Sequence, residues 1–413
     1  MIAATKGQRT SLEMRANDDA QTANLAGIVI IATVLFNAVL AMINGNIVEL
    51  NSNHVIASEM VLFGAALMLA LRRYRSEMLP WFLLMFVAGL FAVLRWAGTG
   101  AFEAKYLRDV LLIPAFVILG MTVQPERLAR PILIVALIAV AVMLLEAFFL
   151  PQYRDLFKVQ EYYISTRDVD PASFWDTEVG LYPSAVREDR MLPFVDLHRL
   201  SSVFLEPVSL GNFCAIVFAY LLAFGKRIPG RTYLVLAASV FALLVGCDGR
   251  LAIVGMILIF AISLIAPFLP KFSVFLYLPF SILAVCVLTW TAGFSPDGNE
   301  FPNRLAHTVA LLEAYGPMEY LGLSERFADR AVDSGIAYWI ATQSALGVAV
   351  TWIWVMFSAR QNTVPQVRYL HAIALYLSIT MLVSASFASI KTAALMWFIL
   401  GALQNDVPSR LQK

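Results

Sequence analysis

Residues 198–224 read HRLSSVFLEPVSLGNFCAIVFAYLLAF, a charged phrase that leads into a long apolar run. The run is about as long as the roughly 20 residues that a helix needs to cross the hydrocarbon core of a bilayer. Arg199 stands at its entrance, and Glu206 lies within its first turns. Ionisable side chains at this depth are costly and usually mark a polar cavity or a site. The stretch therefore predicts a membrane-spanning helix with a functional position at its mouth.

Apolar runs of this kind recur along the whole chain. The sequence is 60% hydrophobic and 14% charged, with a mean hydropathy of +0.74, and this apolar share is well above that of soluble globular domains. We therefore predict an all-α fold, a polytopic membrane helical bundle with about 12 transmembrane helices. The predicted spans are residues 24–44, 54–71, 78–96, 107–124, 131–150, 203–224, 232–247, 250–269, 272–292, 334–358, 369–386 and 388–404.

The charge and the cysteine content exclude several classes of function. The net charge is +1, and no basic tract exists beyond clusters at the predicted membrane edges, so we predict no nucleic-acid partner. Cys214, Cys247 and Cys286 lie in or at the edge of apolar runs, where we expect buried small hydrophobes and no disulfide. The four histidines lack ligand spacing, so we predict no metal and no cofactor.

Lysine and arginine gather in alternate short connections, such as the one that contains Arg72, Arg73 and Arg75. Cytoplasmic connections carry this excess, and an even number of spans then places both chain ends in the cytoplasm. We predict a single transmembrane domain over residues 23–404 between a disordered cytoplasmic tail at 1–22 and a short cytoplasmic tail at 405–413. The first tail does not have the form of a signal peptide, because a long polar lead precedes the apolar run.

Two long connections, at about 151–200 and 293–333, lie on the opposite side in this topology. Connections of this length between packed helices are uncommon and usually functional. Both mix aromatic residues with aspartate, glutamate and arginine. That mixture suits carbohydrate, because aromatic rings stack on the apolar faces of a sugar while charged groups bind its hydroxyls. A folded lid with a small core of its own is an equally good interpretation, and the two are compatible.

The turn Cys247-Asp248-Gly249-Arg250 is so short that both of its charges must lie near the depth of the lipid headgroups. One interpretation is a local ion pair that closes a helical hairpin. The other is that Arg250 binds the phosphates of a lipid-linked substrate, because the fork of donors on arginine matches phosphate oxygens.

Pro207 constrains Glu206, because a residue before proline is pushed out of the helical region. We expect Glu206 at a helix start or a break, with Pro207 in the first turn. Irregular backbone at this depth is tolerated only where it lines a cavity or is buried in protein. Arg199 and Glu206 are then able to address one cavity, and a purely structural pair between them is the alternative.

The pattern Arg199-x-x-Ser202-x-Phe204-x-Glu206-Pro207, followed by Gly211, resembles bacterial Wzy-type polysaccharide polymerases, especially those of exopolysaccharide pathways. The Asp248-Gly249-Arg250 turn looks like a short turn of that family, although no serine precedes the arginine here. The resemblance covers roughly 195–350, and the first ~190 residues match in architecture only. The later part of the resemblance rests on Arg304, Leu321-Gly322, Asp333-Ser334-Gly335, Tyr338 and Gly347.

The resemblance implies a glycosyltransferase that polymerises exopolysaccharide repeat units on the periplasmic face of the bacterial inner membrane. A glycan leaves undecaprenyl diphosphate and joins the next lipid-linked repeat unit, without a nucleotide sugar. The implied partners are the undecaprenyl-diphosphate-linked oligosaccharide and the lipid bilayer. The resemblance also allows two partner proteins, a chain-length co-polymerase and a flippase. An O-antigen ligase that transfers glycan to the lipid A core belongs to the same superfamily. A polysaccharide-lipid transporter or flippase, or a structural partner of an export complex, are alternatives of other classes.

Glycosyl transfer from a lipid diphosphate needs fixed cations for the leaving group and a base for the acceptor hydroxyl. We predict that Arg199 and Arg250 stabilise the diphosphate, and Arg304 and Arg108 are the next candidates for this role. Since arginines serve this purpose, no metal is required. The candidates for the base are Glu206, Asp333 and His307, in that order, and the remaining predicted substrate-binding residues are Asp248 and Tyr338.

Overall fold

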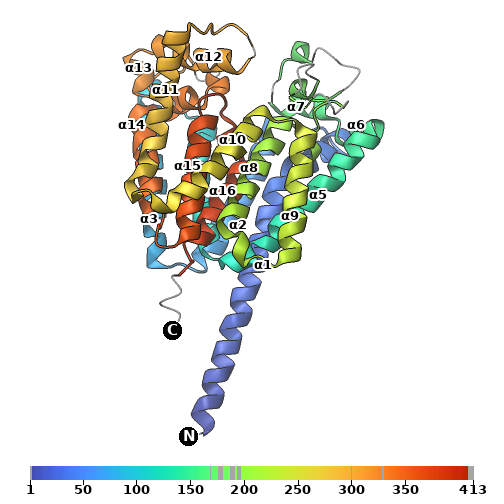
Figure 1. Ribbon diagram of the computed structural model, residues 1–413, viewed down its shortest axis with the longest axis vertical. Helices are drawn as coiled ribbons and strands as arrows, with labels where there is room; N and C mark the ends of the chain where they lie inside the picture. Colours follow the sequence, from blue (N-terminus) through green and yellow to red (C-terminus); the bar gives the residue numbers. More distant parts are fainter. Residues whose placement is uncertain are drawn as a thin grey trace.

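The structure is a computed structural model that describes residues 2–167, 169–174, 180–186, 191–192, 197–298, 300–327 and 330–407. These residues form helices joined by turns, with no strand among them. Figure 1 shows a bundle of long helices with shorter helices at one end. The α-helices are α1 Ile2–Asn46, α2 Ser52–Leu71, α3 Leu79–Thr99, α4 Ala104–Met121, α5 Ala129–Phe148, α6 Leu150–Phe157, α7 Val159–Arg167, α8 Pro207–Phe224, α9 Gly230–Cys247, α10 Arg250–Ile265, α11 Tyr277–Ala292, α12 Phe301–Ala314, α13 Pro317–Tyr320, α14 Gly335–Ser358, α15 Val364–Thr380 and α16 Ile390–Leu403.

Nine helical stretches in the described residues are long and apolar enough to cross a membrane. The chain is therefore a polytopic, membrane-embedded helical bundle, as predicted at that level. The other three predicted spans coincide with α4, α15 and α16. These three helices are not among the nine stretches. α4 carries three charged residues, Lys105, Arg108 and Asp109, and α15 and α16 are short, with 17 and 14 residues. The nine stretches are Asp18–Asn46, Ser52–Leu71, Ser76–Thr99, Pro125–Phe148, Pro207–Arg227, Gly230–Cys247, Arg250–Phe268, Lys271–Ala292 and Gly335–Ser358.

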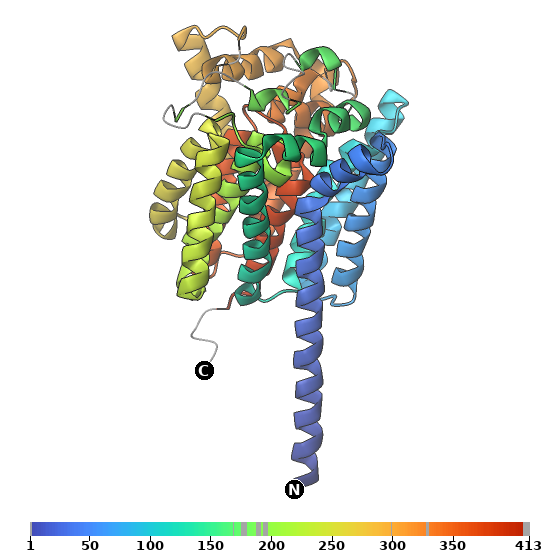
Figure 2. The ribbon, with the colours of Figure 1, turned by 90° about the vertical axis from the view of Figure 1, so that its right-hand side faces the viewer.

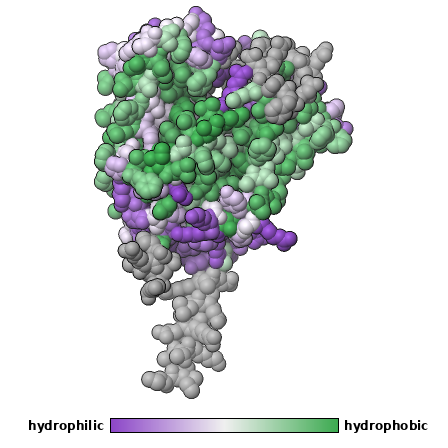
Figure 3. Space-filling model, in the orientation of Figure 1, coloured by the Kyte–Doolittle hydropathy of each residue, from purple (hydrophilic) through white to green (hydrophobic). Residues whose placement is uncertain are grey.

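The two ends of the bundle differ in what they carry. Helices α6, α7, α12 and α13 from the two long connections lie together at one end, which we name the loop end (Figures 1 and 2). Helix α1 protrudes beyond the opposite end, and α16 finishes there; we name this the terminal end. Figure 3 shows a broad hydrophobic band between hydrophilic surfaces at the two ends, as expected for a protein that spans a bilayer.

The first residues do not form the disordered tail that we predicted. Residues 2–46 are one continuous helix, so the first span extends toward the N-terminus for several turns. The segment contains no proline, and alanine, arginine and glutamine recur in it, which favour helix. Asp18 and Asp19 on this extension form ion pairs with Arg73, which ties α1 to the connection between α2 and α3.

Helices α4 and α16 form the centre of the bundle. In α4 every residue from 109 to 121 except Leu111 is buried, and so is all of α16. The two helices run parallel and touch through glycine: a Cβ on Gly120 would fall 2.1 Å from the carbonyl oxygen of Phe398, and one on Gly401 would fall 2.0 Å from that of Val117. Small residues let membrane helices approach backbone to backbone. This contact fixes both helices, so that their N-terminal turns emerge at the loop end.

We predict that Gly120→Ala lowers the melting temperature of the detergent-solubilised protein by several degrees, because its Cβ forces α4 and α16 apart. Gly64→Ala is the matched control, since a Cβ at this exposed position on α2 meets nothing within 4 Å. Replacement of a helical glycine by alanine without a clash stabilises a helix by about 1 kcal/mol. The two variants should therefore shift the melting temperature in opposite directions, and equal shifts would contradict the packing argument.

Candidate functional site

The sequence around Glu206 forms a helix entrance, as predicted. α8 begins at Pro207, and Glu206 precedes it in an extended conformation with φ −141° and ψ 127°. Residues Ser202–Phe204 form a 3₁₀ turn, and Leu205 has a left-handed conformation with φ 60°. The chain therefore enters the bundle as a folded-back, irregular segment before α8 starts.

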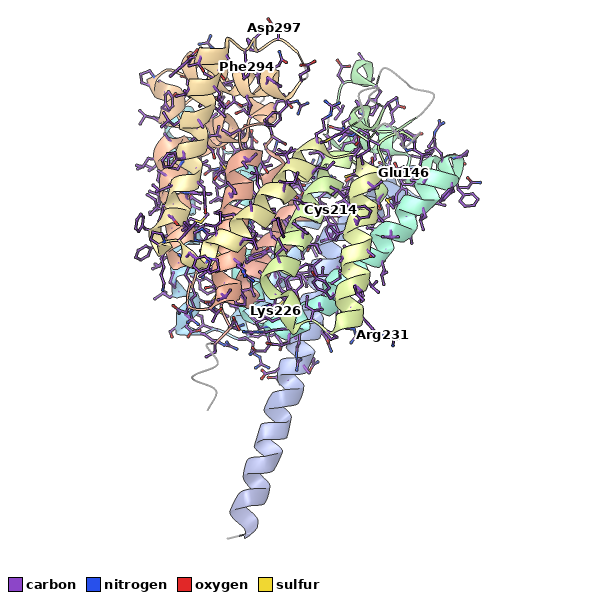
Figure 4. All side chains as sticks on the ribbon, in the orientation of Figure 1. Glu146, Cys214, Lys226, Arg231, Phe294 and Asp297 are labelled. Carbon is purple, nitrogen blue, oxygen red and sulfur yellow. The ribbon has the colours of Figure 1, made fainter. Side chains whose placement is uncertain are left out.

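Glu146 holds this irregular segment in place. Its side chain is fully buried near the loop end of α5 (Figure 4). Its carboxylate accepts hydrogen bonds from the backbone N–H groups of Ser201 (2.9 and 3.0 Å) and Ser202 (2.6 Å), and lies 3.2 Å from Nε2 of His198. The carbonyl of Ser202 accepts from the hydroxyl of Tyr153 at 2.9 Å. Side chains of neighbouring helices thus satisfy backbone groups of Ser201 and Ser202, while the N–H groups of Arg199 and Leu200 donate to the carbonyls of Ala185 and Gly246.

Glu206 is the centre of a polar cluster that we name the Glu206 cluster: Glu206, Lys391, Tyr163 and Ser209. Lys391, in the first turn of α16, lies 3.2 Å from Oε2 of Glu206 and also donates to the carbonyl of Phe204 at 3.0 Å. Ser209 donates to Oε2 at 2.8 Å, and the hydroxyl of Tyr163 donates to Oε1 at 2.5 Å. The side chain of Lys391 is 3% exposed, whereas that of Glu206 is 24% exposed. The carboxylate therefore faces an opening while its cation lies beneath it.

The charge of Glu206 is stabilised in this setting. Burial raises the pKa of its carboxyl, but the ammonium of Lys391 and the hydrogen bonds from Tyr163 and Ser209 outweigh burial, so the pKa is lower than 4.5. Burial and the charge of Glu206 raise the pKa of the Tyr163 hydroxyl well above its usual value. At neutral pH Glu206 is a carboxylate and Tyr163 is a neutral donor.

A second cluster, the Arg108 cluster, consists of Arg108, Glu59, Asp109 and Tyr338. Arg108 forms ion pairs with Glu59 of α2 and with its neighbour Asp109. The other oxygen of Asp109 accepts from the hydroxyl of Tyr338 at 2.7 Å. Arg108 and Tyr338 were both predicted to bind substrate, and the structure brings them to one place. It also commits both of them to Asp109, so their charge and donor capacity are engaged within the protein.

Arg167 links the two clusters from the first long connection. Its guanidinium lies 4.0 Å from Glu59, and its side chain is 33% exposed. Burial lowers the pKa of Arg167, but the surrounding acidic groups, Glu59 and Glu206 among them, raise it to a net value above the usual one. Tyr182 packs against Tyr163 of the Glu206 cluster, with ring centroids 4.7 Å apart and ring planes tilted by 55°. The long connection thus contributes an arginine and two aromatic rings to the site.

Arg199 and Asp248 hold the long connection to the bundle. Arg199 donates to the carbonyls of Cys247 (3.2 Å) and Ser184 (3.1 Å). The buried carboxylate of Asp248 accepts from the backbone N–H groups of Met191 and Leu192 at 2.9 and 3.0 Å. Glu206 pairs with Lys391, and it makes no ion pair with Arg199, another described residue. The alternative, a structural ion pair between Arg199 and Glu206, is therefore not observed, because Lys391 from the last α-helix pairs with Glu206.

The remaining predicted residues lie at the loop end with exposed or half-buried side chains. Arg250 is exposed at the first position of α10, and Asp333 is exposed just before α14. Arg304 and His307 are half-buried on α12, and neither side chain makes a hydrogen bond or an ion pair within the described part of the chain. Burial raises the pKa of Tyr182, and the charge of Asp333 is among the further causes that raise it.

The predicted site residues did not include several residues that complete the site, although the sequence marks three of them. Lys391, Glu59 and Glu146 are single charged residues within predicted apolar spans. Such residues face the interior of a bundle and pair with one another. Tyr163 and Arg167 carry no comparable signal, because the first long connection is rich in tyrosine and arginine. No group of three His, Cys, Asp or Glu residues suited to a metal ion occurs among the residues that the structure describes.

The sequence matches no protein-family model and no curated protein. The chemistry of the site therefore rests on its geometry. An ionised carboxylate has about four positions at which it accepts hydrogen bonds. Three of those positions on Glu206 are occupied by Lys391, Tyr163 and Ser209. One remains, and the side chain is open to solvent, so Glu206 is able to accept one further hydrogen bond from a bound hydroxyl.

We predict that Glu206→Gln lowers the free energy of unfolding by about 3 kcal/mol, because the buried ammonium of Lys391 loses its counter-charge. Lys391→Met should cost less, since the carboxylate of Glu206 is partly exposed and keeps its two hydroxyl donors. The double variant should recover part of the loss, with a coupling of about 1–3 kcal/mol between the two residues. Unfolding in detergent measures all three, and strictly additive losses would show that the pair is not an interacting unit.

The stabilisation by Glu206 should also depend on pH. A carboxyl whose pKa is lowered on folding stabilises the folded state fully above its unfolded pKa and loses that contribution as the pH falls through its folded pKa. The melting temperatures of the wild type and Glu206→Gln should differ by a constant amount from pH 8 to about 5. The difference should shrink below the ordinary pKa of 4.5. A difference that narrows already near pH 6 would mean that the pKa of Glu206 is raised instead.

Proposed function

We propose that the chain is a membrane glycosyltransferase that polymerises lipid-diphosphate-linked oligosaccharides at the loop end of its bundle. The observation that carries the proposal is the Glu206 cluster: an ionised, part-exposed carboxylate held over a buried lysine at the mouth of a membrane helix. A glycosyl transfer requires a base at the point where the acceptor hydroxyl meets the donor sugar. The carboxylate of Glu206 has both the open position and the charge for this task.

In the proposed reaction, the hydroxyl oxygen of the acceptor repeat unit attacks the anomeric carbon of the donor glycan. The bond between that carbon and the diphosphate oxygen breaks, and its electron pair leaves with the lipid diphosphate. The proton of the hydroxyl passes to Glu206. Lys391 and Tyr163 hold the carboxylate toward the opening, and Tyr182 beside them offers a ring on which a sugar stacks.

The diphosphate gains negative charge as it leaves, and fixed cations stabilise that charge. Arg108 is neutralised by Glu59 and Asp109, so we assign this role to cations nearer the surface. Arg250 at the start of α10 and Arg304 on α12 fit best, with Arg199 and His307 beside them at the loop end. Asp333 is the second candidate for a carboxylate that contacts substrate, because it is exposed and its charge reaches Tyr182.

The proposal includes a topology with twelve spans, in which α4, α15 and α16 also cross the membrane. Arg72, Arg75, Lys226 and Arg231 lie in or beside short connections of the terminal end, and this end is then cytoplasmic by the charge rule. The loop end faces the periplasm of a bacterial inner membrane. The lipid-linked donor and acceptor reach the site from the bilayer, and the two long connections cover them.

A ligase that transfers the same donor glycan to a lipid A core remains the nearest alternative, and the supplied acceptor distinguishes the two. A transporter is less consistent with the location of the charges. Glu206 precedes α8, Lys391 is the second residue of α16, and Arg108 and Asp109 lie in the first two turns of α4. Charged sites of secondary transporters lie near the middle of the bilayer instead.

We predict that Glu206→Gln abolishes long polymer and causes single lipid-linked repeat units to accumulate in a strain that lacks the wild-type gene. Removal of a general base typically costs about 10²–10⁴ in rate. The matched control is Glu161→Gln, which changes an exposed carboxylate on α7 in the same long connection. Gel analysis of polymer length at equal protein level provides the measurement.

Three outcomes would contradict the proposal in different ways. Normal polymer in Glu206→Gln would remove Glu206 from the reaction. Glycan transfer to purified lipid A core, without elongation of repeat units, would favour the ligase. Movement of the lipid-linked substrate across proteoliposomes, without new glycosidic bonds, would favour the transporter.

A further inference from the structure

A second concentration of charge lies at the terminal end of the bundle, far from the Glu206 cluster. Arg127 and Arg130 lie at the entrance to α5, Lys226 lies in the connection between α8 and α9, and Arg231 is the second residue of α9. All four residues are exposed. We name them the α5–α9 basic patch, and Figure 4 labels Lys226 and Arg231 at this end.

The two helices that carry the patch are parallel neighbours. Near their other ends, Met143 of α5 lies so close to Gly246 of α9 that a Cβ there would fall 2.6 Å from its sulfur. At the terminal end, Arg227 joins the two turns through a contact of 3.8 Å with Glu126. The four cations therefore gather around one seam between α5 and α9.

The charges of the patch are not balanced by the protein. Arg227 pairs with Asp406 as well as with Glu126. None of the four patch residues forms a side-chain hydrogen bond or an ion pair with any residue in the described ranges. Other arginines of this end are paired, for example Arg73 with Asp18 and Arg360 with Glu77. Four like charges around one seam repel one another, so the arrangement favours an anionic occupant.

Apolar surface continues from the patch toward the middle of the bundle. Leu137 and Leu144 on α5 are exposed, as are Leu234 and Phe241 on α9. Each pair is separated by seven residues, so its members lie on one face of their helix. A molecule with an anionic head and apolar chains matches this arrangement of a basic patch beside an apolar surface. Its head would lie at the patch and its chains along α5 and α9.

We propose that the α5–α9 basic patch is a binding site for the headgroup of an anionic phospholipid, and that lipids with two phosphates bind it best. Basic pockets between membrane helices bind anionic lipid headgroups, and each cation near the membrane surface strengthens binding about fivefold. The site takes its lipid from the leaflet at the terminal end. This lipid site is independent of the proposed reaction at the loop end, because the 18 residues of α8 separate the patch from the Glu206 cluster by about 27 Å.

The test is native mass spectrometry of the full chain in detergent, with added cardiolipin, phosphatidylglycerol or phosphatidylcholine. Wild-type protein should retain cardiolipin most strongly, phosphatidylglycerol less and phosphatidylcholine least. Lys226→Gln/Arg231→Gln should weaken retention of cardiolipin by about 20-fold, since two cations are lost. The matched control is Arg72→Gln/Arg75→Gln, which removes two exposed arginines from the connection between α2 and α3.

Equal losses in both double variants would overturn the proposal, because the effect would then belong to the charge of the whole face. Unchanged retention of cardiolipin in Lys226→Gln/Arg231→Gln would overturn it as well. Inorganic pyrophosphate is the last ligand to compare. If pyrophosphate alone raises the melting temperature of the wild type as much as cardiolipin does, the patch binds soluble anions and is not a lipid site. Melting temperatures without added lipid should be the same in both double variants, which confirms that both are folded.

Discussion

Irregular backbone inside a membrane protein survives only if every polar group on it finds a partner within the protein. Here that requirement falls on residues 198–206, and one buried carboxylate meets it for two consecutive N–H groups. Glu146, fully buried, accepts hydrogen bonds from the N–H groups of Ser201 and Ser202. With that segment fixed, α8 begins at Pro207, and Glu206 faces outward. The position of the candidate site thus depends on an acid that takes no part in its chemistry.

The charges around the site balance almost completely. Lys391, Arg167 and Arg108 stand against Glu206, Glu59 and Asp109, in contacts that connect four elements of the bundle. Charges removed from water are tolerated when they are paired and hydrogen-bonded, and a lone one is costly. Because the network has no net charge, it keeps Glu206 ionised without attracting anions from solution. It also means that an anionic substrate must be held by cations outside the network.

The sequence predicted the helices well, because long apolar runs leave few alternatives to a membrane helix. It also predicted the conformation of Glu206, since the constraint from Pro207 is local. The partners of Glu206 were not predictable in this way. Lys391 reaches it from a helix that begins 184 residues later in the chain, and a contact between such distant segments leaves no local pattern. Arg108 looked like a phosphate ligand because its acidic partner Glu59 lies on another helix.

The position of Lys391 in the last helix has a consequence for how the protein is made. Glu206 is synthesised when half of the chain is still to come, whereas the cation that pairs with it arrives with α16, the last α-helix of the described residues. Until then the carboxylate has the hydroxyl donors Tyr163 and Ser209 and the charge of Arg167 nearby, but not its ion-pair partner. Insertion of α16 therefore does more than complete the bundle, because it also brings that partner to Glu206. A nascent chain that stops before α16 lacks both the central packing against α4 and the ion pair of the Glu206 cluster.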